Sequence, residues 1–200
     1  MVFEEGYLYH IYNQGNNRED IFFSRYNYLF FLNKIRKYIL PYADLLAWCL
    51  MPNHFHLLVL VKHIELSSEG FALSETLANR RSFNDSIGLM LRSYTSAVNK
   101  QLGRSGSLFR KQTKAECLNC PKGLTPSFIL KNGVTQIITT PAAQQYPQIC
   151  FNYIHMNPVK AGLVHRPEDW EFSSAMEYSG LRDDKLTYRN TADEYGLVYE

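Results

Sequence analysis

Two histidines separated by one residue are the clearest candidates for chemistry in this sequence. His54 and His56 lie in the stretch CLMPNHFHLLVLVK (residues 49–62), where an apolar run begins. If this stretch is a strand, alternate residues share a face, so both imidazoles point one way and Phe55 the other. Two parallel imidazoles make half of a metal site. A bare His-x-His pattern is, however, more often a pair of ordinary polar residues on a half-exposed strand.

A tyrosine and an asparagine form a second candidate group, in the later stretch QICFNYIHMNPVKAGLV. We expect a helix over residues 147–156, with a proline near its start and with Asn157 at its end because a proline follows it. Tyr153 and Asn157 are four residues apart and therefore share a helical face. An asparagine carbonyl can complete a His-His-amide metal site, and a neighbouring cation favours the phenolate of a tyrosine. Taken alone, Tyr153 is more simply one of fourteen tyrosines, packing a helix.

The elements that must position these residues follow a clear order. Hydrophobic periodicity predicts strands and helices in the order β-α-β-β-α-β. The strands are expected at residues 7–12, 44–50, 54–62 and 107–117, and the helices at 26–40 and 86–102. This is the split βαβ arrangement of the ferredoxin-like fold. It predicts an α+β protein with a four-stranded antiparallel sheet, two helices on one face, and the other face open to a ligand.

The length of the chain suits a single domain. We expect one domain over residues 1–200, with a ferredoxin-like core at about 6–117. An irregular insertion is expected at about 118–147, because that stretch lacks clean periodicity. The tyrosine helix and a tail then occupy residues 148–200.

Composition is that of an ordinary globular protein, with 46% apolar and 20% charged residues. The first residues lack the basic and apolar regions of a signal peptide, and the longest apolar run, 57–61, is too short to span a bilayer. We therefore expect a cytoplasmic protein without membrane association. The four cysteines are expected to be reduced thiols. Cys117 and Cys120 resemble half of a zinc knuckle, but no second pair completes one.

Charge is distributed unevenly along the chain. Residues 80–131 contain ten Lys or Arg and two acidic residues, whereas residues 166–200 contain four basic and nine acidic residues. A basic middle of this kind predicts a surface that faces a polyanion, although a chance fluctuation in surface charge is the alternative. The predicted phosphate contacts are Arg80, Arg81, Arg92, Lys100, Arg104, Arg110, Lys111 and Lys114.

Four stretches resemble the single-tyrosine HUH transposases, whose hallmark is a His-hydrophobic-His pair on a ferredoxin-like sheet. In the order in which the family has them, they are YHIYNQGNNRE (9–19), WCLMPNHFHLLV (48–59), GSLFRK (106–111) and YIHMNPVKAGLV (153–164). The tail DWEFSSAMEY (169–178) is similar to the group associated with repetitive extragenic palindromes (REP). Two features depart from the family: Gln14 stands where many relatives carry arginine, and the stretch 118–147 is longer than expected.

The resemblance implies an enzyme that cleaves and rejoins single-stranded DNA at or near a hairpin, and hence a nucleoid-associated location. By position, His54, His56 and Asn157 would bind a divalent metal, Mg²⁺ or Mn²⁺. Tyr153 would attack the scissile phosphate, leaving a free 3′-hydroxyl and a 5′-phosphotyrosine. The remaining histidines are expected to be structural: His10, His63, His155 and His165.

The family offers two arrangements of the tyrosine helix. In the minimal insertion-sequence enzymes it serves the partner subunit of an obligate dimer, and in the palindrome-associated group it folds onto its own subunit. The tail favours the second arrangement here, in a monomer or weak homodimer, with Trp170 and Phe172 as anchors and the acidic residues facing solvent or the basic middle.

Two other functions fit the same residues. A metal-dependent hydrolase would use the histidine pair with water as nucleophile and would form no adduct with DNA. A catalytically inactive module would present sheet aromatics to hairpin nucleic acid without cleaving it.

Overall fold

A computed structural model describes residues 1–67, 80–120, 128–131, 134–137 and 142–199. Parts of the insertion predicted at 118–147 fall between these ranges and lie outside the described residues. None of the helices in the described part is both long and apolar enough to cross a membrane.

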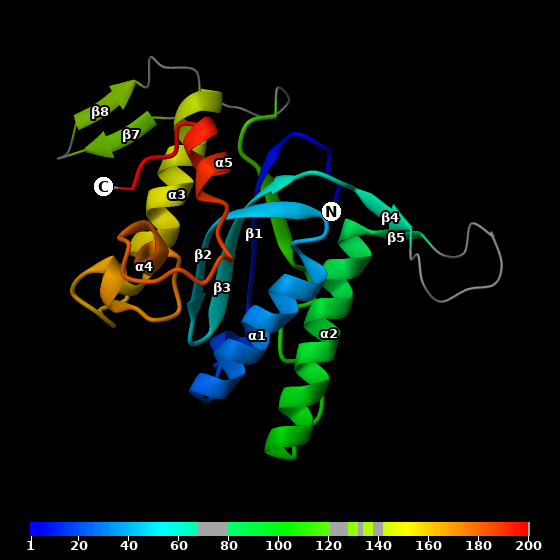
Figure 1. The fold of residues 1–200 in the computed structure, drawn as a ribbon. Helices are drawn as coiled ribbons and strands as arrows, with labels where there is room; N and C mark the ends of the chain where they lie inside the picture. Colours follow the sequence, from blue (N-terminus) through cyan, green and yellow to red (C-terminus); the bar gives the residue numbers. More distant parts are fainter. Residues whose placement is uncertain (68–79, 121–127, 132–133, 138–141, 200) are drawn as a thin grey trace.

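A four-stranded sheet forms the centre of the molecule (Figure 1). Its strands, in sheet order, are β2 (Ala43–Met51), β3 (His54–Val61), β1 (Leu8–Gln14) and β6 (Lys114–Cys117). All neighbouring strands pair antiparallel. The central strands β3 and β1 are buried over nearly their whole length, which agrees with the continuous apolar run after His56. The predicted ferredoxin-like order is confirmed.

Two helices, α1 (Arg25–Tyr38) and α2 (Phe83–Leu102), cover one face of this sheet (Figure 1). Helix α2 begins three residues earlier than predicted because the side chain of Ser82 accepts a hydrogen bond from the backbone N–H of Asp85 and caps the helix. It ends at Gly103, which adopts the left-handed conformation (φ 60°) of a helix C-cap. The main core lies between these helices and the sheet, and it includes Phe55 and Tyr94.

The second face of the sheet is not free, contrary to the expectation. Helix α3 (Ala142–Lys160) lies against β2 and β3 (Figure 1). Phe151 and Ile154 of this helix are fully buried in a second apolar cluster with Cys49 and Leu58 of the sheet. Apolar residues on this sheet face would otherwise be exposed to water, so α3 is held by their burial.

Several predicted boundaries were wrong. Helix α3 is longer than the predicted 147–156 segment, and it continues through both Pro147 and Pro158, so Asn157 lies within the helix. Two paired strands, β7 (Phe128–Lys131) and β8 (Val134–Ile137), lie within the stretch expected to be irregular.

Three short strands also differ from the expectation. The last sheet strand spans only Lys114–Cys117, because the preceding residues Leu108 and Phe109 bury their side chains in loop conformation. A small hairpin of β4 (Glu65–Ser67) and β5 (Arg80–Ser82) was not predicted.

The tail after α3 folds back onto the domain. It contains three short helices: η3 (Pro167–Asp169), α4 (Ala175–Tyr178) and α5 (Arg189–Glu194). The predicted anchors are confirmed: Phe172 is buried and stacks on Tyr28 with ring centroids 3.9 Å apart, and the Trp170 indole N–H donates to the carbonyl of Leu50 (3.0 Å).

The acidic residues of the tail do not all face solvent or the basic middle, as was expected. Glu177 is buried, and its carboxylate accepts hydrogen bonds from the Trp48 indole (3.3 Å) and from the backbone N–H of Thr187 (3.2 Å). Glu171 pairs with Arg25 of α1 rather than with the basic middle. These contacts attach the tail to the sheet and to α1.

The cysteines differ from the expectation of four reduced thiols. Cys117 ends β6, and the chain then turns so that the Cα atom of Cys120 lies 5.8 Å from that of Cys117, within the range of a disulfide. The structure joins this pair in a disulfide. Cys49 and Cys150 are free thiols, as predicted, and the structure buries both.

Candidate active site

The histidine pair lies at the start of β3, immediately after the tight turn that joins it to β2. Phe55 between them is fully buried in the main core, on the side of α1 and α2. His54 and His56 therefore point to the opposite face, toward α3, as the strand alternation predicted. His54 is partly exposed and His56 is 5% exposed.

Each imidazole is held through its Nδ1 atom. Nδ1 of His54 lies 2.5 Å from Oδ1 of Asn53, whose own amide nitrogen donates to the carbonyl of Arg18 (3.2 Å). That bond fixes the Asn53 amide with its oxygen toward His54, so His54 donates from Nδ1 and its Nε2 atom carries a lone pair. Nδ1 of His56 lies 2.8 Å from Nε2 of His10 on β1.

Asn157 of α3 completes the group. Its Oδ1 atom lies 3.3 Å from Nε2 of His54. In this orientation Oδ1 of Asn157 and Nε2 of His54 each direct a lone pair at the other, with no proton between them. A cation bound between the two atoms would stabilise this arrangement. Nε2 of His56 and Nδ2 of Asn157 are buried without a hydrogen-bond partner among the described residues.

These donors fit a divalent metal ion. Two ligand atoms that share an ion at about 2.1 Å lie about 3.0–3.5 Å apart, which matches the spacing of the two facing lone pairs. Within the described ranges, no three His, Cys, Asp or Glu side chains are grouped to hold a metal. The third ligand of the histidine pair would therefore be an amide, and a set of two imidazoles and one carbonyl oxygen suits Mn²⁺ and Mg²⁺ when phosphate oxygens and water complete it.

Burial also favours the neutral imidazoles that a metal requires. It lowers the pKa of His54, and it lowers the pKa of His56 well below the ordinary value, with the nearby rings of His10 and His54 adding to the effect. Burial lowers the pKa of His10 to about 4. At neutral pH all three rings are uncharged, so each carries one N–H and one free lone pair.

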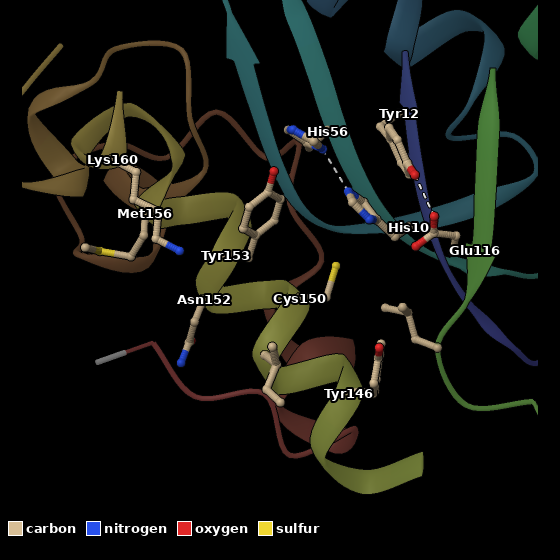
Figure 2. Close-up of a pocket in the computed structure, with 12 residues that line it drawn as sticks. His10, Tyr12, His56, Glu116, Tyr146, Cys150, Asn152, Tyr153, Met156 and Lys160 are labelled. Atoms are coloured by element: carbon tan, nitrogen blue, oxygen red, sulfur yellow. Dashed lines mark hydrogen bonds between the residues drawn. The ribbon is translucent and has the colours of Figure 1, made fainter. Parts of the chain in front are cut away.

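Tyr153 lies one helical turn before Asn157, beside the histidine pair of its own chain. Its ring centroid is 5.3 Å from that of His56 and 6.3 Å from that of His10. The side chain is 39% exposed, and its hydroxyl end is directed toward His56 (Figure 2). Nζ of Lys160, one further turn along α3, lies 5.2 Å from the centre of the Tyr153 ring.

A second tyrosine borders the same group. The ring of Tyr12 lies 5.7 Å from that of His56, but its hydroxyl donates to the carboxylate of Glu116 (2.5 Å), away from the histidine pair (Figure 2). Burial and this hydrogen bond raise the pKa of Tyr12 to about 12. Tyr12 is therefore a poorer nucleophile than an ordinary tyrosine.

Two hollows meet at the contact between His56 and Tyr153. The larger, of about 620 Å³, runs along α3 toward Glu116 and is lined by Tyr146, Ile149 and Met156, among others (Figure 2). The smaller, of about 280 Å³, contains both histidines together with Gln14, Arg110 and Lys114. A ligand that occupies both hollows would thus lie against apolar side chains in the larger one and against polar and basic side chains in the smaller one.

The predicted phosphate contacts do not form one surface. Arg110 and Lys114 line the smaller hollow beside the histidines. A neighbouring hollow of about 650 Å³ between α2 and the loop before β6 is lined by Arg92, Arg104, Arg110 and Lys111. Lys100 lies on α2 but lines neither hollow, and Arg80 and Arg81 lie on the β4–β5 hairpin, on the side of the sheet away from α3 (Figure 1).

His10, Tyr12 and Lys160 lie at this site but were not predicted as site residues. His10 was expected to be structural, yet the structure places it in contact with His56. His10 and Tyr12 alternate along β1, so they share a face, and Tyr12 pairs in register with His56. The alternation was visible in the sequence, but the pairing register was not. The structural assignment of His155 is supported by its burial and by its hydrogen bond to Ser174 (2.7 Å).

Comparison with known proteins adds one finding. No family model matches the sequence, and no curated protein matches it. Among solved structures, the chain is similar to the REP-associated tyrosine transposase bound to a REP hairpin, with a TM-score of 0.52 and 16% sequence identity. The similarity covers 93% of this chain and 85% of the transposase chain. The two proteins share a fold. Because the similarity covers 93% of the chain, the shared fold extends beyond the ferredoxin-like sheet.

Proposed function

We propose that this protein is a transposase-like enzyme that cleaves and rejoins single-stranded DNA beside a hairpin. One observation carries the proposal: Tyr153, His54, His56 and Asn157 come from elements far apart in the sequence and meet on one face of the sheet. The likeness in fold to a transposase whose structure holds a REP hairpin supports the hairpin as the DNA feature that is bound.

In this proposal Tyr153 is the nucleophile. Its hydroxyl loses a proton, and the oxygen forms a bond to the scissile phosphorus. The bond from phosphorus to the 3′-oxygen breaks, and that oxygen takes a proton to become a free 3′-hydroxyl. The product is a 5′-phosphotyrosine, which retains a phosphodiester bond and so permits a later 3′-hydroxyl to reverse the reaction and rejoin a strand.

His54, His56 and Asn157 would hold a divalent ion, Mg²⁺ or Mn²⁺. When bound, the ion polarises the phosphate and neutralises charge that develops during phosphoryl transfer. Arg110 and Lys114 lie in the same hollow as the histidines and would hold the DNA backbone on one side of the reacting phosphate. Lys160 lies on the Tyr153 side, where its charge favours an approaching phosphate.

The experiment that tests this function is capture of the covalent intermediate. The protein is incubated with Mn²⁺ and a single strand that carries a hairpin and a label at its 3′ end, and the products are separated under denaturing conditions. We expect a labelled protein–DNA adduct whose modified peptide contains Tyr153. Cleavage without an adduct would indicate a water-dependent hydrolase, and binding without cleavage would indicate an inactive binding module.

A further inference from the structure

His10 lies behind His56 at the centre of the sheet face. The two strands that carry them, β1 and β3, are neighbours, and the rings stack with centroids 5.0 Å apart. Nε2 of His10 and Nδ1 of His56 are 2.8 Å apart, and both side chains are buried. This is the only hydrogen bond that the described residues provide to the His56 ring.

A single proton lies between these two nitrogens. Which of the two rings carries it decides the tautomer of His56, and therefore whether its Nε2 atom can bind a metal. If His10 donates, His56 carries its own proton on Nε2. That N–H would be buried without an acceptor, which is unfavourable. If His56 donates from Nδ1, its Nε2 atom has a free lone pair that points toward the Tyr153 side of the site.

The surroundings of His10 favour the second arrangement. When His10 accepts at Nε2, its own proton is on Nδ1. Figure 2 shows His10 between His56 and Glu116, so a carboxylate lies on the side of the ring away from His56. A negative charge on that side stabilises an N–H there.

We propose that His10 is a positioning residue, which accepts a hydrogen bond from Nδ1 of His56 and thereby presents the His56 Nε2 lone pair for metal binding. Asn53 has the corresponding role for His54, because its amide oxygen accepts from Nδ1 and leaves Nε2 free. Histidine ligands of metals commonly donate their second N–H in this way, and removal of the acceptor typically weakens metal binding about 10–100-fold. The inference rests on the proposed metal site at His54, His56 and Asn157.

The first test measures Mn²⁺ binding directly, from the electron paramagnetic resonance signal of the free ion, without DNA and without activity. His10→Phe keeps the ring volume but has no acceptor, and we expect its Kd for Mn²⁺ to rise at least 10-fold. His10→Gln restores an acceptor at a similar distance, and we expect a Kd within about 3-fold of the unaltered protein. His63→Gln, at an exposed histidine, is the matched control and should change nothing. A His10→Phe protein that is folded and binds Mn²⁺ as tightly as the unaltered protein overturns the inference.

The second test needs no variant at position 10. Long-range ¹H–¹⁵N correlation spectra of ¹⁵N-histidine protein distinguish the two neutral tautomers of His56, with its signals assigned by their loss in His56→Ala. We expect the proton on Nδ1 in the metal-free protein. A proton on Nε2 overturns the inference. If the unaltered protein has the expected tautomer but binds no Mn²⁺, the proposed metal site is wrong while the role of His10 in fixing the tautomer stands.

Discussion

Tyr12 and Tyr153 both lie near His56, but their hydroxyl groups have different surroundings and therefore different reactivity. The Tyr12 hydroxyl is engaged with Glu116, and its pKa is raised to about 12. Tyr153 is 39% exposed, has its hydroxyl directed toward His56, and borders both hollows that meet there. A phosphate on the proposed metal would therefore meet the Tyr153 oxygen first.

Replacement of Tyr153 by Phe removes one oxygen from a partly exposed ring. We expect the free energy of unfolding to change by less than about 0.5 kcal/mol. Formation of the DNA adduct should fall below detection while hairpin binding persists, as measured by denaturing electrophoresis and by fluorescence anisotropy. Tyr12→Phe is the matched control in the same cavity and should still form the adduct. An adduct that survives in Tyr153→Phe and maps to Tyr12 would show that the nucleophile was misassigned.

The histidine pair provides a prediction on metal binding. His54→Ala combined with His56→Ala removes both imidazoles that we propose as ligands, and we expect Mn²⁺ binding and adduct formation to be lost together. Both side chains point toward α3 and away from the main core behind Phe55, so that core should remain folded, as checked by circular dichroism. Unchanged Mn²⁺ affinity in a folded double variant would rule out this metal site.

At the scale of elements, α3 depends on the tail that follows it. The helix contains two prolines, each of which removes a backbone hydrogen bond, so packing rather than helix propensity holds it in place. The tail residues Trp170 and Phe172 lie against α1 and β2, and Ser174 donates its backbone N–H to Trp48 of β2 (2.9 Å). The position of Tyr153 therefore depends on contacts outside the helix.

Removal of one of these anchors should destabilise the protein measurably. Phe172→Ala deletes a buried ring that stacks on Tyr28, and we expect a loss of about 3–5 kcal/mol in the free energy of unfolding, measured by urea denaturation. Phe23, which is 42% exposed, provides the matched control. Phe23→Ala should cost less than about 1 kcal/mol. Equal losses in the two variants would contradict the anchoring role of Phe172.

The predicted phosphate contacts fall into different groups according to the element that carries them, and their contributions to DNA binding can be measured separately. The cations that line the two basic hollows are Arg92, Arg104, Arg110, Lys111 and Lys114. If all five contact phosphates of a single strand, the slope of log K against log salt should be roughly −3.5, taking about −0.7 for each contact. Arg110→Ala with Lys114→Ala should make the slope about 1.4 units shallower. The matched pair Arg80→Ala with Arg81→Ala, on the β4–β5 hairpin, should leave it unchanged; the reverse result would place the DNA on the hairpin side.

At the scale of the whole molecule, the candidate site is assembled within one chain. The sheet supplies the histidines, and α3 of the same chain supplies Tyr153 and Asn157. The tail contacts α3 through η3 and forms backbone hydrogen bonds with β2, the strand at the edge of the sheet. This arrangement agrees with the expectation that the tyrosine helix folds onto its own subunit.

Complementation tests whether the active enzyme uses this arrangement. A Tyr153→Phe protein is mixed with a His54→Ala, His56→Ala protein under conditions that allow subunit exchange. If each site is built from one chain, the mixture contains no complete site, and adduct formation should stay at the level of the separate variants. Recovery of a large fraction of unaltered activity would mean that α3 serves a partner subunit.

The sequence by itself determined the order of the core elements, because apolar periodicity depends only on neighbours along the chain. It placed His54 and His56 on one strand face and Tyr153 and Asn157 on one helix face for the same reason. The resemblance to the single-tyrosine HUH transposases then predicted that the two pairs belong to one site. Where local signals were weak, as in the short last strand and in the stretch that contains β7 and β8, the prediction failed.

The tertiary structure decided which side chains meet across elements. His10 and Tyr12 alternate visibly along β1, but only the register that pairs Tyr12 with His56 brings them to the site. The acidic residues of the tail were expected to face solvent or the basic middle, yet the fold buries Glu177 because the Trp48 indole and the Thr187 amide supply its hydrogen bonds. Helix α3 runs past Pro158 because its apolar face is buried against the sheet, and burial outweighs the one hydrogen bond that proline removes. Such contacts join residues distant in the chain, and spacing along a sequence does not encode them.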